Sequence, residues 1–206
     1  MESTGLKTLL HVGCGLQSKE VLPALDFENE WREVRVDIDP AVKPDVIDDI
    51  RTLSTIPDSS VHYLFSKHNL EHLEFHEVPV CLANFYRVLD DTGFAVIRTP
   101  DLEGICRAVL EHGPEKTLYS TETHDGMKDI MGLDMLFGAS WAIGHGNSFM
   151  AHRTAFTTNT LTAKLEAAGF EKVAISASRG ELRGFALKKS ANNAYWKVSG
   201  KTPEAA

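Results

Sequence analysis

The chain has 206 residues and a mass of 22.7 kDa, with 43% hydrophobic and 24% charged residues. A chain of this size buries roughly 70% of its unfolded surface, so neither a disulfide nor a metal ion is needed for folding. The composition excludes long disorder, and no apolar stretch approaches the roughly 18 residues of a membrane span. The net charge of −8 argues against nucleic acid as a partner, because an acidic surface repels phosphate groups.

The cysteine content predicts a reducing, cytoplasmic location. Cys14, Cys81 and Cys106 are odd in number and widely spaced, unlike a disulfide framework or a set of zinc ligands. The first residues have neither a basic segment nor a long apolar core, so we do not expect a signal peptide. The oligomeric state is left open by the sequence.

Short apolar runs predict buried strands at residues 6–12, 33–36, 46–47 and 61–65. Apolar residues at three- and four-residue spacing then predict an amphipathic helix, whose buried face carries Val78, Leu82, Phe85 and Leu89. Thr92 and Gly93 predict a turn. Residues 94–97 predict a fifth strand that ends before Pro100.

The second half of the chain predicts an insertion followed by a helix and a hairpin. Residues 101–110 can form a helix, and glycines punctuate residues from about 113 to 153, which predicts an insertion of short helices and loops. We interpret the methionine and aromatic residues of the insertion as core rather than as a substrate pocket. Thr157 can cap a helix that runs to residue 168, and residues 173–178 and 182–188 predict an antiparallel hairpin.

This alternation of strands and helices predicts a doubly wound α/β fold. The sheet is expected to be mostly parallel, with helices on both faces and an antiparallel strand in the C-terminal hairpin. We expect one domain over residues 1–190 and a loose tail over residues 191–206. Lys188 and Lys189 are interpreted as a solvated strand end.

Glycines and carboxylates follow the predicted strands, where ligands bind in parallel α/β sheets. Gly13 and Gly15 permit positive φ angles and the close approach of a ligand to bare backbone amides. Asp37 can accept hydrogen bonds from both hydroxyls of a ribose, and Asp49 can accept one from an adenine amino group. Cys14 is interpreted as a small residue in a tight turn rather than a reactive thiol.

Taken as a series, the motifs resemble the class I S-adenosylmethionine-dependent methyltransferases, within the broad methyltransferase type 11 group. The matching motifs are LLHVGCG at 9–15, VDID at 36–39, DVIDDI at 45–50, HNLEHL at 68–73, RVLDDTG at 87–93 and FAVIRTPD at 94–101. The resemblance covers about residues 7–189 and implies a Rossmann-like sheet of seven strands. Two positions depart from the pattern: His11 replaces the usual acid, and Gln17 replaces the third glycine of many members.

The resemblance implies S-adenosylmethionine as cofactor, with the glycine loop at its methionine part, Asp37 at the ribose and Asp49 near the adenine. The implied cofactor site comprises Gly13, Cys14, Gly15, Asp37, Ile38, Asp49, Ile50 and Ser66. The implied reaction is a direct displacement in which the acceptor attacks the methyl carbon of the sulfonium and the sulfur leaves. The acceptor is a small molecule or another, unidentified group. His68 follows the fourth strand, and His145 and His152 lie in the insertion, where each could act as a base. His68 and His145, the latter between two glycines, are the candidate catalytic residues.

Two other functions are open. A nicotinamide-dependent dehydrogenase is disfavoured, because its fingerprint needs a third glycine where this chain has Ser18. A non-catalytic binding or scaffold protein with the same fold is motivated by His11 and Gln17.

A metal site is not predicted. His68, His72 and His76 are spaced by four residues with Glu71 and Glu74 between them, which on one helix would form a metal-binding face. The segment leaves a strand, however, and the next helix is expected to begin only near His76.

Overall fold

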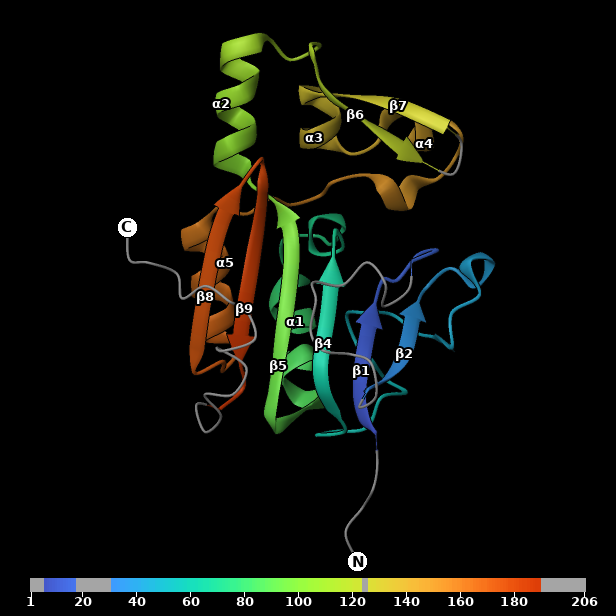
Figure 1. Cartoon of the computed structure of the whole chain (residues 1–206), viewed down its shortest axis with the longest axis vertical. Coiled ribbons are helices and arrows are strands. Elements are labelled where there is room, and N and C mark those ends of the chain that lie inside the picture. Colours follow the sequence, from blue (N-terminus) through green and yellow to red (C-terminus); the bar gives the residue numbers. More distant parts are fainter. Residues whose placement is uncertain (1–5, 18–30, 124–125, 190–206) are drawn as a thin grey trace, which may run out of the picture.

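The computed structural model describes residues 6–17, 31–123 and 126–189. Its centre is a seven-stranded sheet in the order β3-β2-β1-β4-β5-β9-β8, in which β9 alone runs antiparallel to its neighbours (Figure 1). The strands are β1 (Lys7–Val12), β2 (Trp31–Asp37), β3 (Val46–Ile47), β4 (Val61–Lys67), β5 (Leu89–Pro100), β8 (Lys172–Ser178) and β9 (Glu181–Leu187). This confirms the mostly parallel α/β sheet with an antiparallel C-terminal hairpin. The predicted tail at 191–206 lies outside the described residues.

The sheet buries side chains on both faces, because successive residues of a strand point to opposite sides. Leu10 and Leu64 belong to a large cluster on one face, whereas Leu9 and Phe65 belong to a second cluster on the other face. The first face is covered by α1 (Val78–Val88) and α5 (Thr158–Ala167), which lie behind the sheet in Figure 1. The predicted apolar stripe of α1 is therefore its buried face, although the helix ends at Val88 and Leu89 opens β5.

One expected turn is a bulge within a longer strand. Strand β5 continues through Thr92 and Gly93, and the pairing moves from Val61 with Leu89 to Tyr63 with Phe94. The extra residues are accommodated because the Asp90 carboxylate accepts hydrogen bonds from the backbone and hydroxyl of Thr92. The predicted turn at Thr92 and Gly93 is thus part of strand β5, because β5 pairs with β4 and β9 on either side of it.

The elements after residue 156 follow the prediction. The Thr157 side chain accepts a hydrogen bond from the Thr160 amide and caps α5, and Gly169 leaves the helix with a φ of +107°. Strands β8 and β9 are antiparallel around Arg179 and Gly180, both with positive φ.

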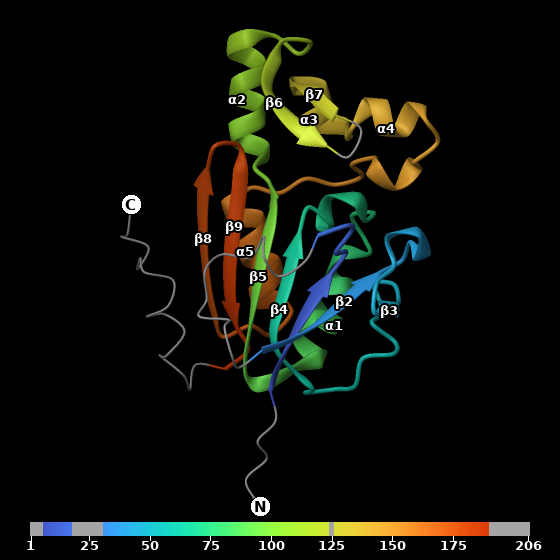
Figure 2. The ribbon, with the colours of Figure 1, turned by 45° about the vertical axis from the view of Figure 1, so that its right-hand side comes forward.

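The insertion forms a separate layer beyond the strand tips (Figure 2). It is composed of β6 (Thr117–Thr123), β7 (Gly126–Met131), α3 (Gly132–Phe137), α4 (Ser140–Gly144) and the short helix η4 (Ser148–Met150), and follows α2 (Leu102–His112). The short helices were predicted, whereas the β6–β7 hairpin was not. Gly138 pairs with Ala151 in an isolated bridge that only glycine permits, since a side chain there would lie 1.9 Å from the Met150 carbonyl.

Lys188 is not the solvated residue that the sequence suggested. Its side chain is buried, its ammonium donates to the Leu89 carbonyl at 2.6 Å, and it lies 4.8 Å from the centre of the Tyr86 ring. Lys189 does point to solvent and pairs with Asp91. Within the described ranges, no helix is long and apolar enough to cross a membrane.

Candidate cofactor and acceptor site

The four N-terminal strands bring their carboxyl ends together at one edge of the sheet. The order β3-β2-β1-β4 places β1 at the centre, with its two neighbours parallel to it. The chain proceeds from β1 to one side and returns on the other, so this edge is the topological switch point where open α/β sheets bind ligands. The expected convergence of the strand tips is therefore confirmed.

The two glycines of the loop after β1 serve different purposes. Both have positive φ, +57° at Gly13 and +52° at Gly15. A methyl group on Gly13 would lie 2.0 Å from Oδ1 of Asn69, whose Nδ2 donates to the Val12 carbonyl and to Ser66 Oγ. A methyl group on Gly15 would meet no atom of the described residues within 4 Å. Gly13 thus makes room for a neighbouring side chain, and Gly15 is the glycine with open space beside it.

The Asp37 carboxylate lies beside the open glycine and keeps part of its acceptor capacity. Oδ2 accepts the Gly15 amide at 2.8 Å and Oδ1 accepts the Asp39 amide at 2.9 Å. A carboxylate offers about four acceptor positions, so two remain for ligand hydroxyls. The next residue, Ile38, is 44% exposed and supplies an apolar surface at the same place.

Arg35 fixes the far side of the glycine loop. Its guanidinium donates to the carbonyls of Gly15 at 2.7 Å and Gln17 at 3.0 Å. Many members of the family that the chain resembles have a third glycine where this chain has Gln17. Here the Gln17 carbonyl is fixed instead by the hydrogen bond from Arg35 of β2.

Asp49 and Asp48 are more heavily engaged than the sequence suggested. The Arg51 guanidinium and amide occupy both oxygens of Asp49, and these hydrogen bonds lower the pKa of that carboxyl. Asp48 is buried and accepts the amide and hydroxyl of Thr55. Ile50 packs against the core cluster beneath them. Asp49 therefore contacts an adenine only if Arg51 moves, and its adenine role stays a prediction.

Cys14 and Ser66 are buried beneath the loop. Burial raises the pKa of the Cys14 thiol to about 11, so it remains protonated at neutral pH. The Cys14 amide donates to Val36 at 3.2 Å, and Ser66 Oγ accepts from Asn69. Their geometry fits structural support of the loop.

His11 is buried on the opposite face of β1 from Leu10. Its Nδ1 lies 3.0 Å from Oε1 of Glu33, and its ring packs edge-on against Phe65. Burial lowers the pKa of His11 despite the carboxylate beside it. The acid that the resemblance expects at this position is thus supplied from the adjacent strand.

His68 is held between two carboxylates just beyond β4. Its Nδ1 lies 3.2 Å from Glu71 and its Nε2 lies 3.1 Å from Glu181, with an unusual φ of +54°. Burial would lower the pKa of His68, but the hydrogen bonds to Glu181 and Glu71 raise it to about 9. An imidazole that already carries a proton is a donor, so this arrangement favours an orienting or donating role over that of a base.

Comparison with known proteins adds evidence at the level of the fold. No family model and no curated protein matches this sequence. The solved structures that resemble it include an S-adenosylmethionine-dependent methyltransferase from Archaeoglobus fulgidus, with a TM-score of 0.55 and 16% identity over 88% of this chain and 86% of the other.

The chain has the class I methyltransferase fold.

Two further structures resemble this methyltransferase fold. The 1,6-didemethyltoxoflavin-N1-methyltransferase of Burkholderia thailandensis, solved with 1,6-didemethyltoxoflavin and S-adenosylhomocysteine, has a TM-score of 0.52 and 15% identity over 90% of this chain and 72% of the other. A possible exported protein of Bordetella parapertussis has a TM-score of 0.57 and 14% identity over 90% of this chain. This chain spans only 63% of the Bordetella protein's length.

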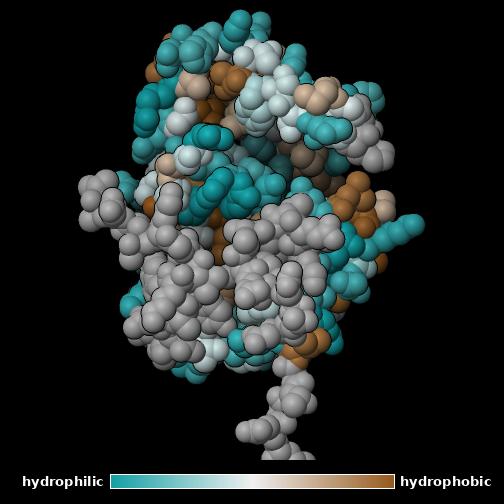
Figure 3. Space-filling view, in the orientation of Figure 1, coloured by the Kyte–Doolittle hydropathy of each residue, from teal (hydrophilic) through white to brown (hydrophobic). Residues whose placement is uncertain are grey.

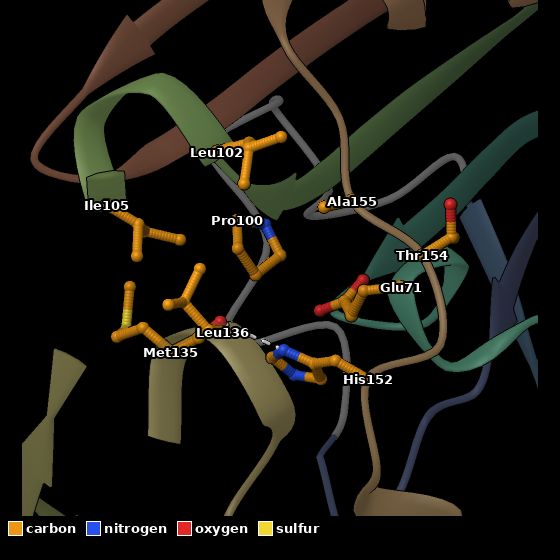
Figure 4. Close-up of a pocket in the computed structure, with 9 residues that line it drawn as sticks. All are labelled: Glu71, Pro100, Leu102, Ile105, Met135, Leu136, His152, Thr154 and Ala155. Carbon is orange, nitrogen blue, oxygen red and sulfur yellow. Dashed lines mark hydrogen bonds between the residues drawn. The ribbon is translucent and has the colours of Figure 1, made fainter. Parts of the chain in front are cut away.

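The insertion of this methyltransferase fold faces the strand tips across a hollow in the surface (Figure 3). A narrow pocket lies at the junction, with a volume of about 10 Å³, room for about one water molecule. Its lining comes from the turn after β4, the start of α2, α3 and the insertion's exit, namely Glu71, Pro100, Leu102, Ile105, Met135, Leu136, His152, Thr154 and Ala155 (Figure 4).

Two lining residues, Glu71 and His152, belong to a cluster with His72 that spacing along the sequence could not reveal. Ligating atoms of Glu71, His72 and His152 lie within 4.8 Å of one another, although the last residue is 81 and 80 positions from the first two. Of the residues that the sequence had grouped with them, His76 is exposed and Glu74 pairs with Arg153. The sequence had offered His152 as a possible base of the insertion, and its grouping with Glu71 and His72 is what the structure adds.

His145 has a local explanation. Its Nδ1 donates to the Trp141 carbonyl at 2.6 Å at the end of α4, and its side chain is exposed. Its catalytic role stays a prediction.

Proposed function

We propose that this chain is an S-adenosylmethionine-dependent methyltransferase that acts on a small-molecule acceptor. The observation that carries the proposal is the pairing of Asp37 with Gly15. The carboxylate bonds the loop amide with one lone pair of Oδ2 and keeps two acceptor positions beside open space. A ribose diol fits this arrangement, because its two hydroxyls can donate to one carboxylate.

The rest of the cofactor extends from that contact. The methionine portion would lie along the loop of Gly13, Cys14 and Gly15. Ser66, at the end of β4, supports this loop through its hydrogen bond with Asn69. Ile38 and Ile50 offer apolar contact to the adenine, beside Asp49. The protein's share of a methyl displacement is alignment and exclusion of water, for which an insertion facing the strand tips is suited.

His68 is the proposed catalytic residue nearest the transferred methyl group, since it follows β4 directly. The carboxylates of Glu71 and Glu181 favour the charged form of His68. In that form His68 would orient an acceptor by donating a hydrogen bond rather than by removing a proton. His145 is retained as the second candidate, on an exposed loop of the insertion. The Burkholderia enzyme, solved with bound 1,6-didemethyltoxoflavin, supports the small-molecule class.

The cytoplasmic location is part of the same proposal. It is supported by the three free thiols, two of which are buried.

Calorimetric titration tests the proposal against its alternatives. S-adenosylmethionine and S-adenosylhomocysteine are each expected to bind the folded protein at one site per chain, and a nicotinamide dinucleotide is expected not to bind. Absence of heat with millimolar S-adenosylmethionine would support the non-catalytic scaffold instead. Binding of the dinucleotide alone would support the dehydrogenase.

A further inference from the structure

We propose that Glu71, His72 and His152 form a binding site for a divalent transition-metal ion of the zinc type, at the junction of the insertion and the sheet. Their ligating atoms lie within 4.8 Å of one another. Two imidazoles and one carboxylate are a ligand set that zinc adopts in sites with an open coordination position. Figure 4 shows Glu71 and His152 side by side in the pocket wall, reaching it from different segments.

The tautomer of both histidines is fixed by the backbone. Nδ1 of His72 lies 3.1 Å from the Ala151 carbonyl, and Nδ1 of His152 lies 3.0 Å from the Met135 carbonyl. A carbonyl oxygen can only accept, so each Nδ1 carries a proton and the lone pair of each neutral ring resides on Nε2. Metal-binding histidines are oriented by the same contact, a hydrogen bond from the nitrogen that does not bind the metal.

The carboxylate is oriented as well. Glu71 is 1% exposed, its Oε2 accepts from the Thr99 hydroxyl at 3.0 Å, and its Oε1 lies 3.2 Å from His68 Nδ1. Each oxygen has one further lone pair after these contacts. Glu71 is the anionic side chain among the three ligands. His68 is shared between Glu71 and Glu181, so it leaves a lone pair on each Glu71 oxygen for a cation.

The backbone holds the two halves of the cluster together. The amides of Arg153 and Thr154 donate to the Glu71 carbonyl at 2.7 and 3.2 Å, and the His152 amide donates to Phe137 at 3.0 Å. The exit of the insertion is therefore clamped between α3 and the turn after β4. This clamp positions His152 against Glu71 although the chain between them is long.

The geometry requires only a small contraction on binding. Metal–ligand distances of about 2.0–2.2 Å at tetrahedral angles place ligand atoms about 3.4 Å apart. The widest separation allowed here, 4.8 Å, exceeds that value by about 1.4 Å, which is the contraction that binding would require. The His72 and His152 rings, with centres 5.1 Å apart, tilt by 58° to each other and do not stack.

Three protein ligands leave a fourth coordination position for a non-protein ligand, and the pocket beside Glu71 and His152 has room for about one water molecule. If the proposed methyltransferase function holds, an oxygen or nitrogen of the acceptor would displace that water. This last step rests on the proposed function, whereas the metal site itself does not.

Metal binding is tested without cofactor. The full-length protein is stripped with a chelator, and Zn²⁺, Co²⁺ and Mg²⁺ are titrated calorimetrically, with the visible absorption of bound Co²⁺ as a second readout. We expect one Zn²⁺ or Co²⁺ per chain and no saturable Mg²⁺ binding. His72→Ala and His152→Ala are each expected to weaken Zn²⁺ binding at least tenfold, since even the loss of an outer contact costs about that much.

His76→Ala is the matched control, because this exposed imidazole lies in the same segment but outside the cluster. It is expected to bind Zn²⁺ like the wild type. If His152→Ala does not fold, the site is tested with Glu71→Gln, which should also weaken Zn²⁺ binding. The Co²⁺ spectrum of the wild type then serves as the second measurement of the site. The absence of saturable Zn²⁺ and Co²⁺ binding, or an equal loss in His76→Ala and His152→Ala, overturns the site. The metal titration contains no S-adenosylmethionine, so its outcome is independent of whether the protein binds that cofactor. Failure of the metal site and failure of the proposed function can therefore be told apart.

Discussion

Oδ2 of Asp37 accepts the backbone amide of Gly15 at 2.8 Å, which joins the tip of β2 to the loop after β1. The contact is local in space but spans 22 residues of sequence. It aligns the carboxylate with the open side of the glycine loop, so that the loop and the carboxylate act as one binding element.

Asp37→Ala is expected to weaken binding of S-adenosylmethionine by more than tenfold. The substitution removes a charged acceptor from a half-buried ribose contact, and hydrogen bonds to charged groups contribute about 1.5–3 kcal/mol. Calorimetric titration measures the effect. Asp91→Ala is the matched control, since Asp91 pairs with Lys189 away from the strand tips. Unchanged affinity in folded Asp37→Ala protein counts against the ribose contact.

Gly13→Ala is expected to destabilise the fold by about 2–4 kcal/mol, and Gly15→Ala by about 1–2 kcal/mol. Both substitutions force alanine into positive φ, but only the first displaces Asn69 from its hydrogen bonds to Val12 and Ser66. Urea unfolding measures both. In an Asn69→Ala background the extra cost of Gly13→Ala should disappear. If Gly13→Ala lowered the free energy of unfolding equally in the wild type and in Asn69→Ala, Asn69 would not be the reason that position 13 requires glycine.

Glu181 gives the fold a predictable acid sensitivity. Burial would raise the pKa of Glu181, but hydrogen bonds from His68, Arg98 and Arg183 lower it to about 2 from 4.5. Because the folded pKa lies below the unfolded one, its stabilisation is complete above pH 4.5 and is lost as pH falls towards 2.

We therefore expect Glu181→Gln to lower the free energy of unfolding by up to about 3 kcal/mol at neutral pH. The difference from wild type should shrink as the pH falls below 4.5, in urea unfolding at a series of pH values. Exposed Glu111→Gln serves as control. Parallel pH profiles for wild type and Glu181→Gln would contradict the assignment.

Lys188→Met is expected to destabilise the protein by about 1–3 kcal/mol, because it leaves the buried Leu89 carbonyl without its side-chain donor and ends the contact with the Tyr86 ring. Lys189→Met removes the adjacent, half-exposed ammonium and should change stability by less than about 0.5 kcal/mol. Thermal or urea unfolding of the two variants gives the comparison. A similar loss of unfolding free energy in both variants would show that the contacts of Lys188 contribute no more to stability than those of Lys189.

Much of the fold could be predicted because periodicity and caps are local signals. The apolar runs of β1 and β4, the stripe of α1 and the Thr157 cap all specify their elements within a few residues. The β6–β7 hairpin could not be recognised, because Thr117–Thr123 is mostly polar and lacks a buried alternation. The Thr92 turn signal misled, since its outcome depended on strand pairing rather than on local preference.

The candidate site was predictable in part for the same reason. Gly13, Gly15 and Asp37 lie at strand ends, so their convergence follows from the parallel sheet alone. The pairing of Asp49 with Arg51 and the burial of Lys188 depend on side-chain contacts that no spacing encodes. His152 meets Glu71 only because the insertion folds back across the turn after β4.

A crystal structure with S-adenosylhomocysteine measures the central claim most directly. We expect the ribose hydroxyls to lie within hydrogen-bond distance of the Asp37 carboxylate and the sulfur-bearing chain to pass over Gly15. A ligand bound elsewhere, or a ribose that leaves Asp37 uncontacted, would contradict it.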